Sequence, residues 1–406
     1  MALNTALSGI NAAQSDLNVI ANNIANANTT GFKGSRAEFA DIFAVTGLNL
    51  NSTAVGSGVT LQEVAQQFNQ GDLQTTGNSL DLAINGNGFF AVNNGSGVQY
   101  TRAGDFEKNS NGFITSPDGS RLQIYPPNGA GGFDMSTLTD FSWQTAQSSA
   151  TATSSITLSS NLPASATVPT NPFSTTDSTS YNNAAPVTVY DSQGGSHQAT
   201  IYYVKTGTNT WNANLYVDGQ NAGTQPMTFD STGKLTTPTS GTLAFNPVNL
   251  GNGSSPLTLS LNVNNITQFG TDYSAAPIIQ NGFEAGTLSG IDIDEKGVIT
   301  ATYSNNQSTQ IGQVAIANFA NVQGLRQLGN TTWAASTDSG PATMGTASSG
   351  EFGTIESGEL ESSNTADTTA QLVDMIQAQR DYQANAQVLT TDNTLASTLF
   401  SAISAR

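Results

Sequence analysis

The chain lacks cysteine altogether and contains a single histidine among its 406 residues. Without cysteine the protein can form neither a disulfide framework nor a site that depends on thiol chemistry. One histidine with no cysteine argues against a transition-metal site and against a Ser-His catalytic triad. We therefore expect His197 to be a surface residue of a strand.

Charged side chains are scarce: they make up 10% of the residues, against about 25% in an average soluble domain. The net charge of −18 results from having only 11 lysines and arginines, which are scattered along the chain. They form no basic stripe, so we expect no binding to nucleic acid or to an anionic membrane surface. The polar surface must come from Ser, Thr, Asn, Gln and Gly.

Long apolar runs are also missing. No stretch of about 18 apolar residues occurs, so we expect no membrane insertion. The first residues have no basic segment, and Asn4, Ser8 and Asn11 interrupt their apolar positions. We expect no cleaved signal peptide, and any export would use a route that does not need one.

Nothing in the sequence forms a convergent catalytic set. Gly86-Asn87-Gly88 is followed by a strand pattern, whereas a dinucleotide loop needs a helix N-terminus at that point. The acidic residues Asp292, Asp294 and Glu295 form too short a cluster for a calcium loop. The carboxylate pair of a glycosidase has no sequence signature, so an enzyme stays the third alternative. We expect no catalytic residues, no bound cofactor and no metal.

The two ends of the chain carry its strongest pattern, a heptad of apolar and small residues. Its steps alternate between four and three, as do the a and d positions of a coiled coil. The N-terminal set is Leu3, Leu7, Ile10, Gln14, Leu17, Ala21 and Ile24. The C-terminal set is Leu372, Met375, Gln379, Tyr382, Ala386, Leu389, Asn393, Ala396, Phe400 and Ile403. The spacing predicts helices over 1–28 and 366–406 that bring the two termini together as a coiled coil, with all-β domains nested between them.

The first helix is expected to weaken before it ends. Asn22, Asn23 and Asn26 lie close to its end, and asparagine favours caps and turns over helix interiors. Gly31 can follow the C-cap, because glycine tolerates a positive φ. Two interpretations of the asparagine-rich run stay open: a soft helix end and a specific interface role.

A connector is predicted over 29–72 and 356–365. Its first apolar positions are spaced like a short helix or an irregular packed segment; they are Phe32, Phe39, Ile42 and Phe43. Residues 49–58 have loop composition, and 59–68 fit a strand or a short amphipathic stretch. Asp367, or the threonine after it, can cap the last helix.

Strands with tight turns are predicted in the middle. Apolar residues on both sides of Asn85-Gly86-Asn87-Gly88 predict a β-hairpin over 80–92. We predict a first β domain made from 73–145 and 281–355. An outer all-β sandwich or barrel is predicted over 146–280. The Asn-Gly turn signal recurs at 94–95, 111–112, 128–129, 252–253 and 281–282.

Three blocks of the sequence resemble the signature of the bacterial flagellar rod and hook proteins. The first is ANNIANANTTGFK at 21–33, and the second is QGDLQTTGNSLDLAINGNGFF at 70–90. The third is GELESSN at 358–364, followed by LVDMI at 372–376 and QRDYQAN at 379–385. The blocks lie in the order found in the family and cover both ends and the first β domain.

Within this family, the chain is similar to the hook members rather than to the shorter distal rod members. The similarity lies in its length, its β insertion and the strings at 187–194 and 312–321. A distal rod or other axial protein stays the alternative, followed by a secreted β-rich adhesin or fibre subunit.

The resemblance implies a flexible helical tube of identical subunits that carries torque from rod to filament outside the cell. Terminal helices would form its inner layer and β domains its outer layers. It also implies export through the flagellar type III apparatus, and contacts with the distal rod, the hook cap and the hook-filament junction proteins. The cysteine-dependent cross-link of spirochaete hooks has no cysteine to use here.

The heptads and the resemblance together predict a self-assembly interface in the terminal segments. Its residues are Leu3, Leu7, Ile10, Gln14, Leu17, Ala21, Asn22, Asn23, Ile24, Asn26, Gly31, Phe32, Lys33, Leu372, Met375, Ile376, Gln379, Tyr382, Ala386, Leu389, Phe400 and Ile403.

Both ends are predicted to be largely disordered in the dilute monomer and to fold on self-association, because their heptads mix apolar residues with Ala, Gln and Asn. Circular dichroism of the monomer should then show little terminal helix. A stable intramolecular coiled coil is the alternative. It is favoured if a strong helix signal is present in dilute monomer and disappears when residues 1–28 and 366–406 are deleted.

Overall fold

The computed structural model describes residues 2–42, 56–143 and 148–404. The chain forms two compact units: the first comprises 1–146, 291–301 and 309–406, and the second 147–290 and 302–308. The predicted fold class, terminal helices that pack together with a β-rich middle, is confirmed. The finer division into four parts stays a prediction. Phe43 and most of the loop predicted over 49–58 lie outside the described residues.

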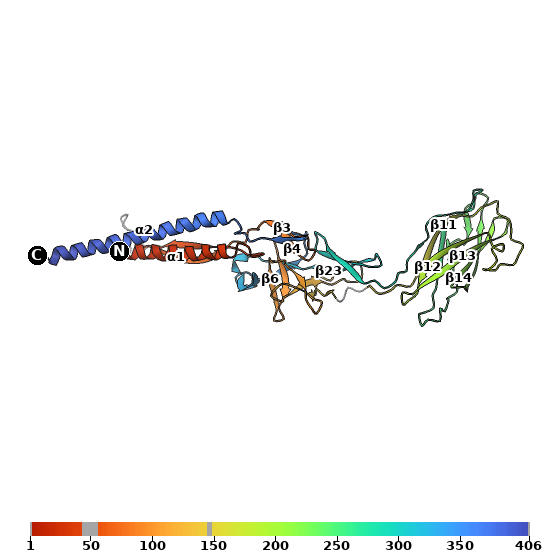
Figure 1. Cartoon of the computed structure of the whole chain (residues 1–406), viewed down its shortest axis with the longest axis horizontal. Helices are drawn as coiled ribbons and strands as arrows, with labels where there is room; N and C mark the ends of the chain where they lie inside the picture. Colours follow the sequence, from red (N-terminus) through yellow and green to blue (C-terminus); the bar gives the residue numbers. More distant parts are fainter. Residues whose placement is uncertain (1, 43–55, 144–147, 405–406) are drawn as a thin grey trace. The chain divides into compact units, whose positions relative to one another are not determined.

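The first unit contains both terminal helices, α1 (Ala2–Ala25) and α2 (Thr368–Ser404), which lie side by side (Figure 1). Asn22 and Asn23 are still helical, and turns follow from Asn26. Gly31 has a φ of 65°, but it lies six residues beyond the last residue of α1, so its predicted place directly after the C-cap is wrong. Its backbone N–H instead donates to the Glu361 carbonyl at 2.8 Å, a contact distant in sequence. Asp367 caps α2: its Oδ1 accepts the backbone N–H groups of Thr369 at 3.0 Å and Ala370 at 3.3 Å.

Short strands make up most of the rest of the first unit. Before the second unit they are β1 (Ser35–Asp41), β2 (Val59–Gln66), β3 (Leu73–Thr75), β4 (Leu82–Asn85), β5 (Phe89–Asn93), β6 (Val98–Thr101), β7 (Glu107–Lys108), β8 (Ile114–Thr115), β9 (Arg121–Tyr125) and β10 (Thr139–Asp140). After it they are β24 (Ile316–Asn318), β25 (Arg326–Gly329), β26 (Thr332–Ala334), β27 (Thr343–Gly345), β28 (Thr354–Ser357) and β29 (Glu359–Glu361), with a 3-10 helix at Val322–Gly324. Three strands have residues in both units: β21 (Leu288–Ile293), β22 (Val298–Tyr303) and β23 (Ser308–Val314).

The largest sheet has the strand order β21-β22-β23-β9-β5-β6-β26-β25, with β7, β8, β10, β24 and β27 attached beside this path. Aromatic rings pack edge-on against both faces of β5, because Phe89 and Phe90 are consecutive strand residues. The Phe89 and Trp333 ring centroids are 5.7 Å apart, and those of Phe90 and Phe106 are 5.5 Å apart.

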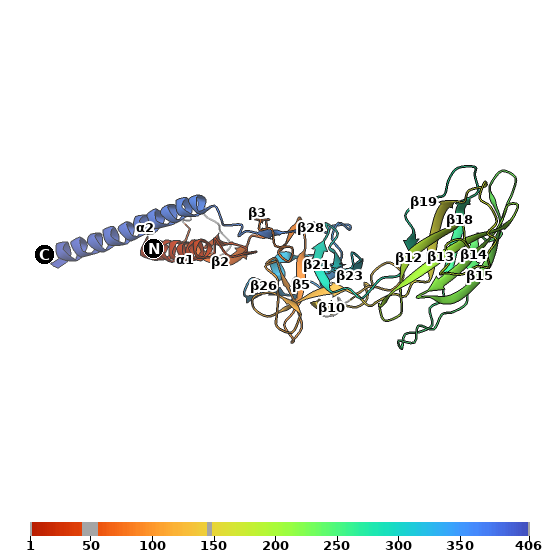
Figure 2. The same ribbon diagram turned by 45° about the vertical axis from the view of Figure 1, so that its right-hand side comes forward.

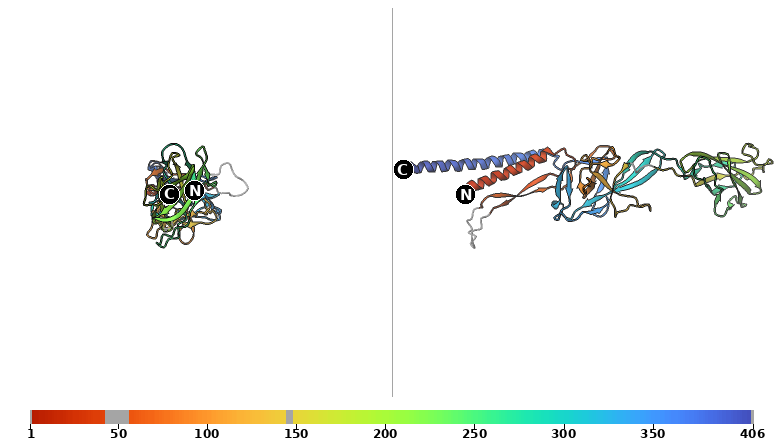
Figure 3. Two further views of the ribbon diagram at one scale, coloured as in Figure 1. Left: turned by 90° about the vertical axis from the view of Figure 1, so that its right-hand side faces the viewer. Right: turned by 90° about the horizontal axis from the view of Figure 1, so that it is seen from below.

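β1 and β2 form an antiparallel hairpin that runs along α1 (Figure 3). The backbone N–H of Val59 donates to Ser8 Oγ of the helix at 3.2 Å. The short helix considered around Phe39 is therefore wrong, whereas the strand considered over 59–68 is confirmed. Phe39 pairs with Leu61 across the hairpin, and this cross-strand partner is distant in sequence, which local spacing cannot reveal.

The hairpin predicted over 80–92 is also wrong. β4 pairs with β28, more than 260 residues away, whereas β5 pairs with β6, β9 and β24. Gly86 and Gly88 have φ values of 113° and 130°, so the chain bends away between β4 and β5 instead of folding back on itself. The Asn-Gly signal at 94–95 does join a hairpin, that of β5 and β6.

The second unit is a sandwich of two five-stranded sheets (Figure 2). One has the order β12-β13-β14-β15-β16, from β12 (Asn183–Tyr190), β13 (Ser196–Gly207), β14 (Thr210–Val217), β15 (Gln220–Phe229) and β16 (Leu235–Thr237). The other has the order β17-β18-β11-β19 with β20 beside β11, from β11 (Ser155–Asn161), β17 (Thr242–Ala244), β18 (Ser260–Thr267), β19 (Ser274–Ala275) and β20 (Ile279–Gln280). Alternate residues of both sheets, with Trp211 at the centre, share one apolar core.

His197 lies on strand β13, but its side chain is only 13% exposed. Its Nδ1 lies 2.6 Å from Asp218 Oδ2 and its Nε2 lies 3.1 Å from Asp191 Oδ2. Burial by itself would lower the pKa of His197, but the two carboxylates outweigh burial, so its pKa is raised. The single histidine is thus a bridge between two turns of the sandwich, rather than the solvated surface residue expected from the sequence.

The second unit should lose stability as the pH rises above 6.5 and through the raised pKa of His197, because the folded state binds this proton more tightly than the unfolded state. The chain has one histidine, so a proton NMR titration gives a single imidazole C2–H signal. We expect a midpoint above 6.5, lowered in Asp218→Asn. His197→Gln should remove the pH dependence of unfolding in this range. A midpoint at or below 6.5 would contradict the bridge.

Candidate assembly site in the terminal helices

The terminal helices α1 and α2 pack antiparallel. Asn23 Nδ2 donates to Gln371 Oε1 at 3.3 Å, and a Cβ on Gly9 would come within 2.6 Å of Asn385 Oδ1. Fourteen residues separate the two contact points on each helix, so the register is continuous. At Gly9 the absence of a side chain lets the helices approach closely.

The buried face of α1 repeats every seven residues, at Ala6, Ala13 and Ile20, and buried Ala27 continues this spacing in the turn after the helix. Each of the first three lies one residue before a predicted heptad position, and one residue is a rotation of about 100° around a helix. The predicted period is therefore present, but the chain packs on a neighbouring face. The predicted positions are exposed at Leu3, Leu7, Gln14 and Ala21, and half-buried at Ile10, Leu17 and Ile24.

α2 shows the same displacement. The side chains that are at least partly buried include Gln371, Ala378 and Asn385, again one residue before predicted positions. Predicted Met375, Ala386 and Leu389 are half-buried. Leu372, Ile376, Gln379, Tyr382, Asn393, Ala396, Phe400 and Ile403 are exposed. Within the described chain, then, apolar side chains remain uncovered on both helices.

α2 extends beyond the start of α1 (Figure 1). The register that sets Gly9 opposite Asn385 brings Ala2 level with Asp392. Residues 393–404, which we call the overhang, therefore have no α1 residue opposite them. All are exposed, Phe400 by 75%.

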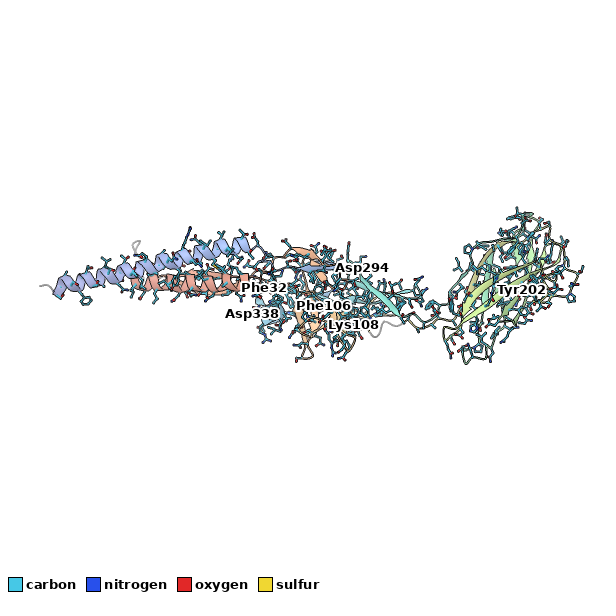
Figure 4. The ribbon with its side chains drawn as sticks, viewed as in Figure 1. Phe32, Phe106, Lys108, Tyr202, Asp294 and Asp338 are labelled. Atoms are coloured by element: carbon cyan, nitrogen blue, oxygen red, sulfur yellow. The ribbon has the colours of Figure 1, made fainter. Side chains whose placement is uncertain are left out.

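The polar residues predicted after α1 are used differently, in a buried junction between the helices and the β domain. Lys33 Nζ lies 2.6 Å from Glu361 Oε1, and both side chains are fully buried. Arg102 Nη1 lies 3.3 Å from Glu361 Oε2. Lys33 also donates to the Asn69 carbonyl at 2.9 Å. Phe32, labelled in Figure 4, is buried beside this network at the end of α1.

Arg102 extends the network to strand β4. Its Nη1 donates to the Ile84 carbonyl at 3.1 Å, and its Nη2 to the Gly86 carbonyl at 2.6 Å. Burial lowers the pKa of Arg102 and also that of Lys33, while Glu361 acts in the opposite direction on both. One carboxylate thus holds cations from two separate segments.

Two asparagines complete the junction. Asn23 Oδ1 accepts the Ser35 N–H at 2.9 Å, and its Nδ2 donates to the Ser35 carbonyl at 2.8 Å. Asn364 Oδ1 accepts the Gly34 N–H at 2.7 Å, and its Nδ2 donates to the Gln67 carbonyl. Each of these side-chain amides bonds to a backbone N–H and a backbone C=O group, as the main chain of a neighbouring strand would. This requires a side chain with both a donor and an acceptor, which asparagine has.

Of the predicted interface residues in this region, Asn23, Gly31, Phe32 and Lys33 are buried inside the chain, whereas Asn22 is exposed and Asn26 is half-buried. Gly31 has no room for a side chain, since a Cβ would lie 2.4 Å from the Ala103 nitrogen. The structure assigns these buried residues intramolecular contacts, and their part in self-assembly stays a prediction.

Sequence reasoning did not single out Arg102, Asn69 or the pairing of Glu361 with Lys33. Glu361 and Asn364 belong to the third block that resembles the family signature. The resemblance marked the block but indicated no contact for either residue. Arg102 had no local signal, because its partners are carbonyls and a carboxylate from distant segments.

Acidic side chains lie close together across the helix pair. Burial raises the pKa of Asp16 on α1, and Asp374 and Asp381 on α2 raise it further. Neither a cofactor nor a catalytic base is indicated by this arrangement. Among the described residues, no group of three or more His, Cys, Asp or Glu side chains could hold a metal ion. No helix in that part of the chain has the length and apolarity to cross a membrane.

Family models match four segments of the chain. They are "Flagella basal body rod protein" at 3–33, "Flagellar hook protein FlgE/F/G D1 domain" at 83–171, "Flagellar basal body protein FlaE D2 domain" at 161–283 and "Flagellar basal body rod FlgEFG protein C-terminal" at 356–402. The flagellar hook proteins of Salmonella typhimurium and Escherichia coli are each 38% identical to this chain, over 98% of it and 99% of the relative. The chain belongs to the flagellar hook protein family. The hook protein of Borreliella burgdorferi is 29% identical over 97% of both chains.

The fold of this hook-family chain also resembles a solved structure. The crystal structure of the Helicobacter pylori flagellar hook protein FlgE2 matches with a TM-score of 0.51, over 71% of this chain and all of that one. The two sequences are 14% identical, so the likeness concerns the fold alone.

Glu361→Gln should destabilise the junction strongly, because Lys33 and Arg102 would stay buried without their counter-charge. Breaking one partner of a buried ion pair costs about 3–5 kcal/mol. Hydrogen exchange measured on peptides that span 67–75 and 356–366 should report this loss.

The matched control is Glu38→Gln, which breaks the exposed Arg36–Glu38 pair, whose atoms are 2.8 Å apart. An exposed pair contributes about 0–1 kcal/mol, so exchange in the junction should not change. Equal effects of the two variants would contradict the role of Glu361.

Proposed function

We propose that this protein is the structural subunit of the bacterial flagellar hook, and that it self-assembles into a flexible helical tube that transmits torque from rod to filament. The observation that carries the proposal is the uncovered apolar surface of α1 and α2. Leu7, Leu372 and Phe400 are 49%, 49% and 75% exposed on helices that are otherwise held in place by the junction. Such surfaces in a soluble chain mark protein contacts.

Membership of the hook family supplies the identity of the assembly. The curated relatives aligned over nearly their full length carry the name flagellar hook protein. The proposed partners follow: further copies of the chain, the distal rod, the hook cap, the hook-filament junction proteins and the flagellar type III export apparatus. The proposed location is the extracellular part of the flagellum. A distal rod or other axial protein is the second candidate, supported by the family model that FlgE shares with F and G members.

The family is structural, and no catalytic role is proposed. Few charges and many Asn, Ser and Thr residues suit subunit contacts that can be exchanged as a tube bends, because each such contact is weak. The flexibility of the tube is thus attributed to a polar outer surface and its cohesion to the terminal helices.

The double substitution Leu3→Ser/Leu7→Ser should abolish or greatly reduce tube formation, as seen by negative-stain electron microscopy. Both side chains are exposed, so their loss removes apolar contact between copies and little contact within the helix pair. The circular dichroism spectra of the variant and unmodified monomers should therefore agree, whatever the helix content of the ends in dilute solution.

Asn4→Ser/Asn11→Ser changes two exposed polar positions of the same helix and serves as the control. We expect it to assemble normally. Normal tubes from the leucine variant, or globular monomers from the unmodified chain under all conditions, would contradict the proposed function.

A further inference from the structure

The overhang differs from the rest of α2 in carrying no charge. Residues 393–404 contain no Asp, Glu, Lys or Arg, and they present four large apolar side chains to solvent: Leu395, Leu399, Phe400 and Ile403. Ala396 and Ile403 continue the seven-residue spacing of half-buried Leu389, so the side of α2 that faces α1 continues past the end of α1. Among residues 2–42, 56–143 and 148–404, none covers these side chains of the overhang, which therefore present an apolar surface to a partner.

A groove lies at the opposite end of the same helix pair. It has a volume of about 530 Å³ and is bounded by α1, β1 and the first turns of α2. Val19, Ile20, Ala37 and Phe39 form an apolar strip in its lining, and of these Phe39 is 38% exposed. The rest of the lining is polar, with Asp16, Asp374 and Arg36 as its charged residues.

We propose that the overhang of one copy occupies the groove of a second copy. This inference rests on the proposed self-assembly and names the two surfaces that carry it. The overhang cannot reach the groove of its own chain, because α2 is one continuous helix and the two places are about 25 residues, or roughly 38 Å, apart along it.

The distribution of charge along α2 favours the overhang, rather than the earlier turns of the helix, as the segment that occupies the groove. The earlier turns of α2 carry Asp374, Asp381 and Asp392 against Arg380, a net charge of −2. The groove carries Asp16 and Asp374 against Arg36, a net charge of −1, so the earlier turns would meet it with net like-charge repulsion. The overhang brings no charge into a site where acidic groups already raise the pKa of Asp16. The overhang therefore contributes only apolar side chains, hydroxyl-bearing side chains and the amide of Asn393 to this contact.

The geometry also decides the type of polymer. The two surfaces are different and lie at opposite ends of one helix pair, so each copy can engage two others in a heterologous, head-to-tail contact that does not close as a dimer. Copies joined in this way would repeat at roughly 38 Å along the helix direction, the separation of overhang and groove.

Cysteine cross-linking tests the contact cleanly, since the chain has no cysteine of its own. Full-length Ala396→Cys and full-length Gln377→Cys are mixed, assembled and treated with a short thiol–thiol cross-linker. Ala396 is on the overhang and Gln377 lines the groove. We expect the cross-linked heterodimer to be the main product, identified by mass spectrometry with one copy isotope-labelled.

Two matched variants define the surfaces. Thr398→Cys, two residues on and so about 200° around the helix, should give little heterodimer with Gln377→Cys. Gln14→Cys places the thiol on the exposed face of α1, and preferential cross-linking of Ala396→Cys to Gln14→Cys would overturn the inference in favour of that face. Tubes that form without the Ala396–Gln377 product would also overturn it, while leaving the proposed function intact.

A second measurement does not depend on thiols. Phe400→Ser and Phe39→Ser, one on each surface, should each raise the critical concentration for assembly on the order of tenfold, as expected for loss of one central aromatic at an interface. Combining them should add little, because both remove the same contact. Fully additive effects, or no effect of Phe39→Ser, would overturn the pairing of these surfaces. Absence of tubes from the unmodified chain would overturn the proposed function and this inference together.

Discussion

The carboxylate of Glu361 is the interaction on which the rest of the first unit depends. A fully buried carboxylate must be paired, and here its oxygens take Lys33, Arg102 and the backbone N–H of Gly71. These groups come from segments up to 328 residues apart in sequence. A buried ion network adds modest net stability, but leaving it incomplete is costly, so it specifies which segments must meet. Here it specifies that the end of α1 and the start of α2 leave the β domain together.

Because the junction holds the end of α1 and the start of α2 together, the helix pair depends on few contacts between the two helices themselves. Their shared face is built from alanine, glycine, asparagine and glutamine, with few large apolar side chains. Such a face permits close approach and covers little area, so Leu3, Leu7, Leu372 and Phe400 of the heptads remain exposed. Polar contacts at the junction position the helices, and apolar side chains are left exposed on both of them.

The β units serve this arrangement in different ways. In the first, β3 and β4 pair with β29 and β28, so the returning chain runs beside the outgoing one up to the junction. The second is a separate sandwich with its own core around Trp211, tied by His197 between two aspartates. This unit can be inserted into the chain at little cost in loop entropy because its first and last segments lie side by side, joined by the bridges Ser148–Gly286 and Thr151–Phe283.

The sequence by itself determined the periodic and local features. The seven-residue repeats of both ends, the cap at Asp367 and the Asn-Gly turn at 94–95 depend only on neighbouring residues, and each was predicted. The family could be identified from three linear blocks because they are contiguous in sequence. Period alone could not say which face of α1 is buried, since Ala6 and Leu7 repeat equally well and differ only in what the fold brings against them. The tertiary structure decided this face, the partner of β4, the bridging position of His197 and the meeting of Lys33 with Glu361. Each depends on a contact between residues far apart in the chain, and the energy of such a contact is absent from any local stretch of sequence.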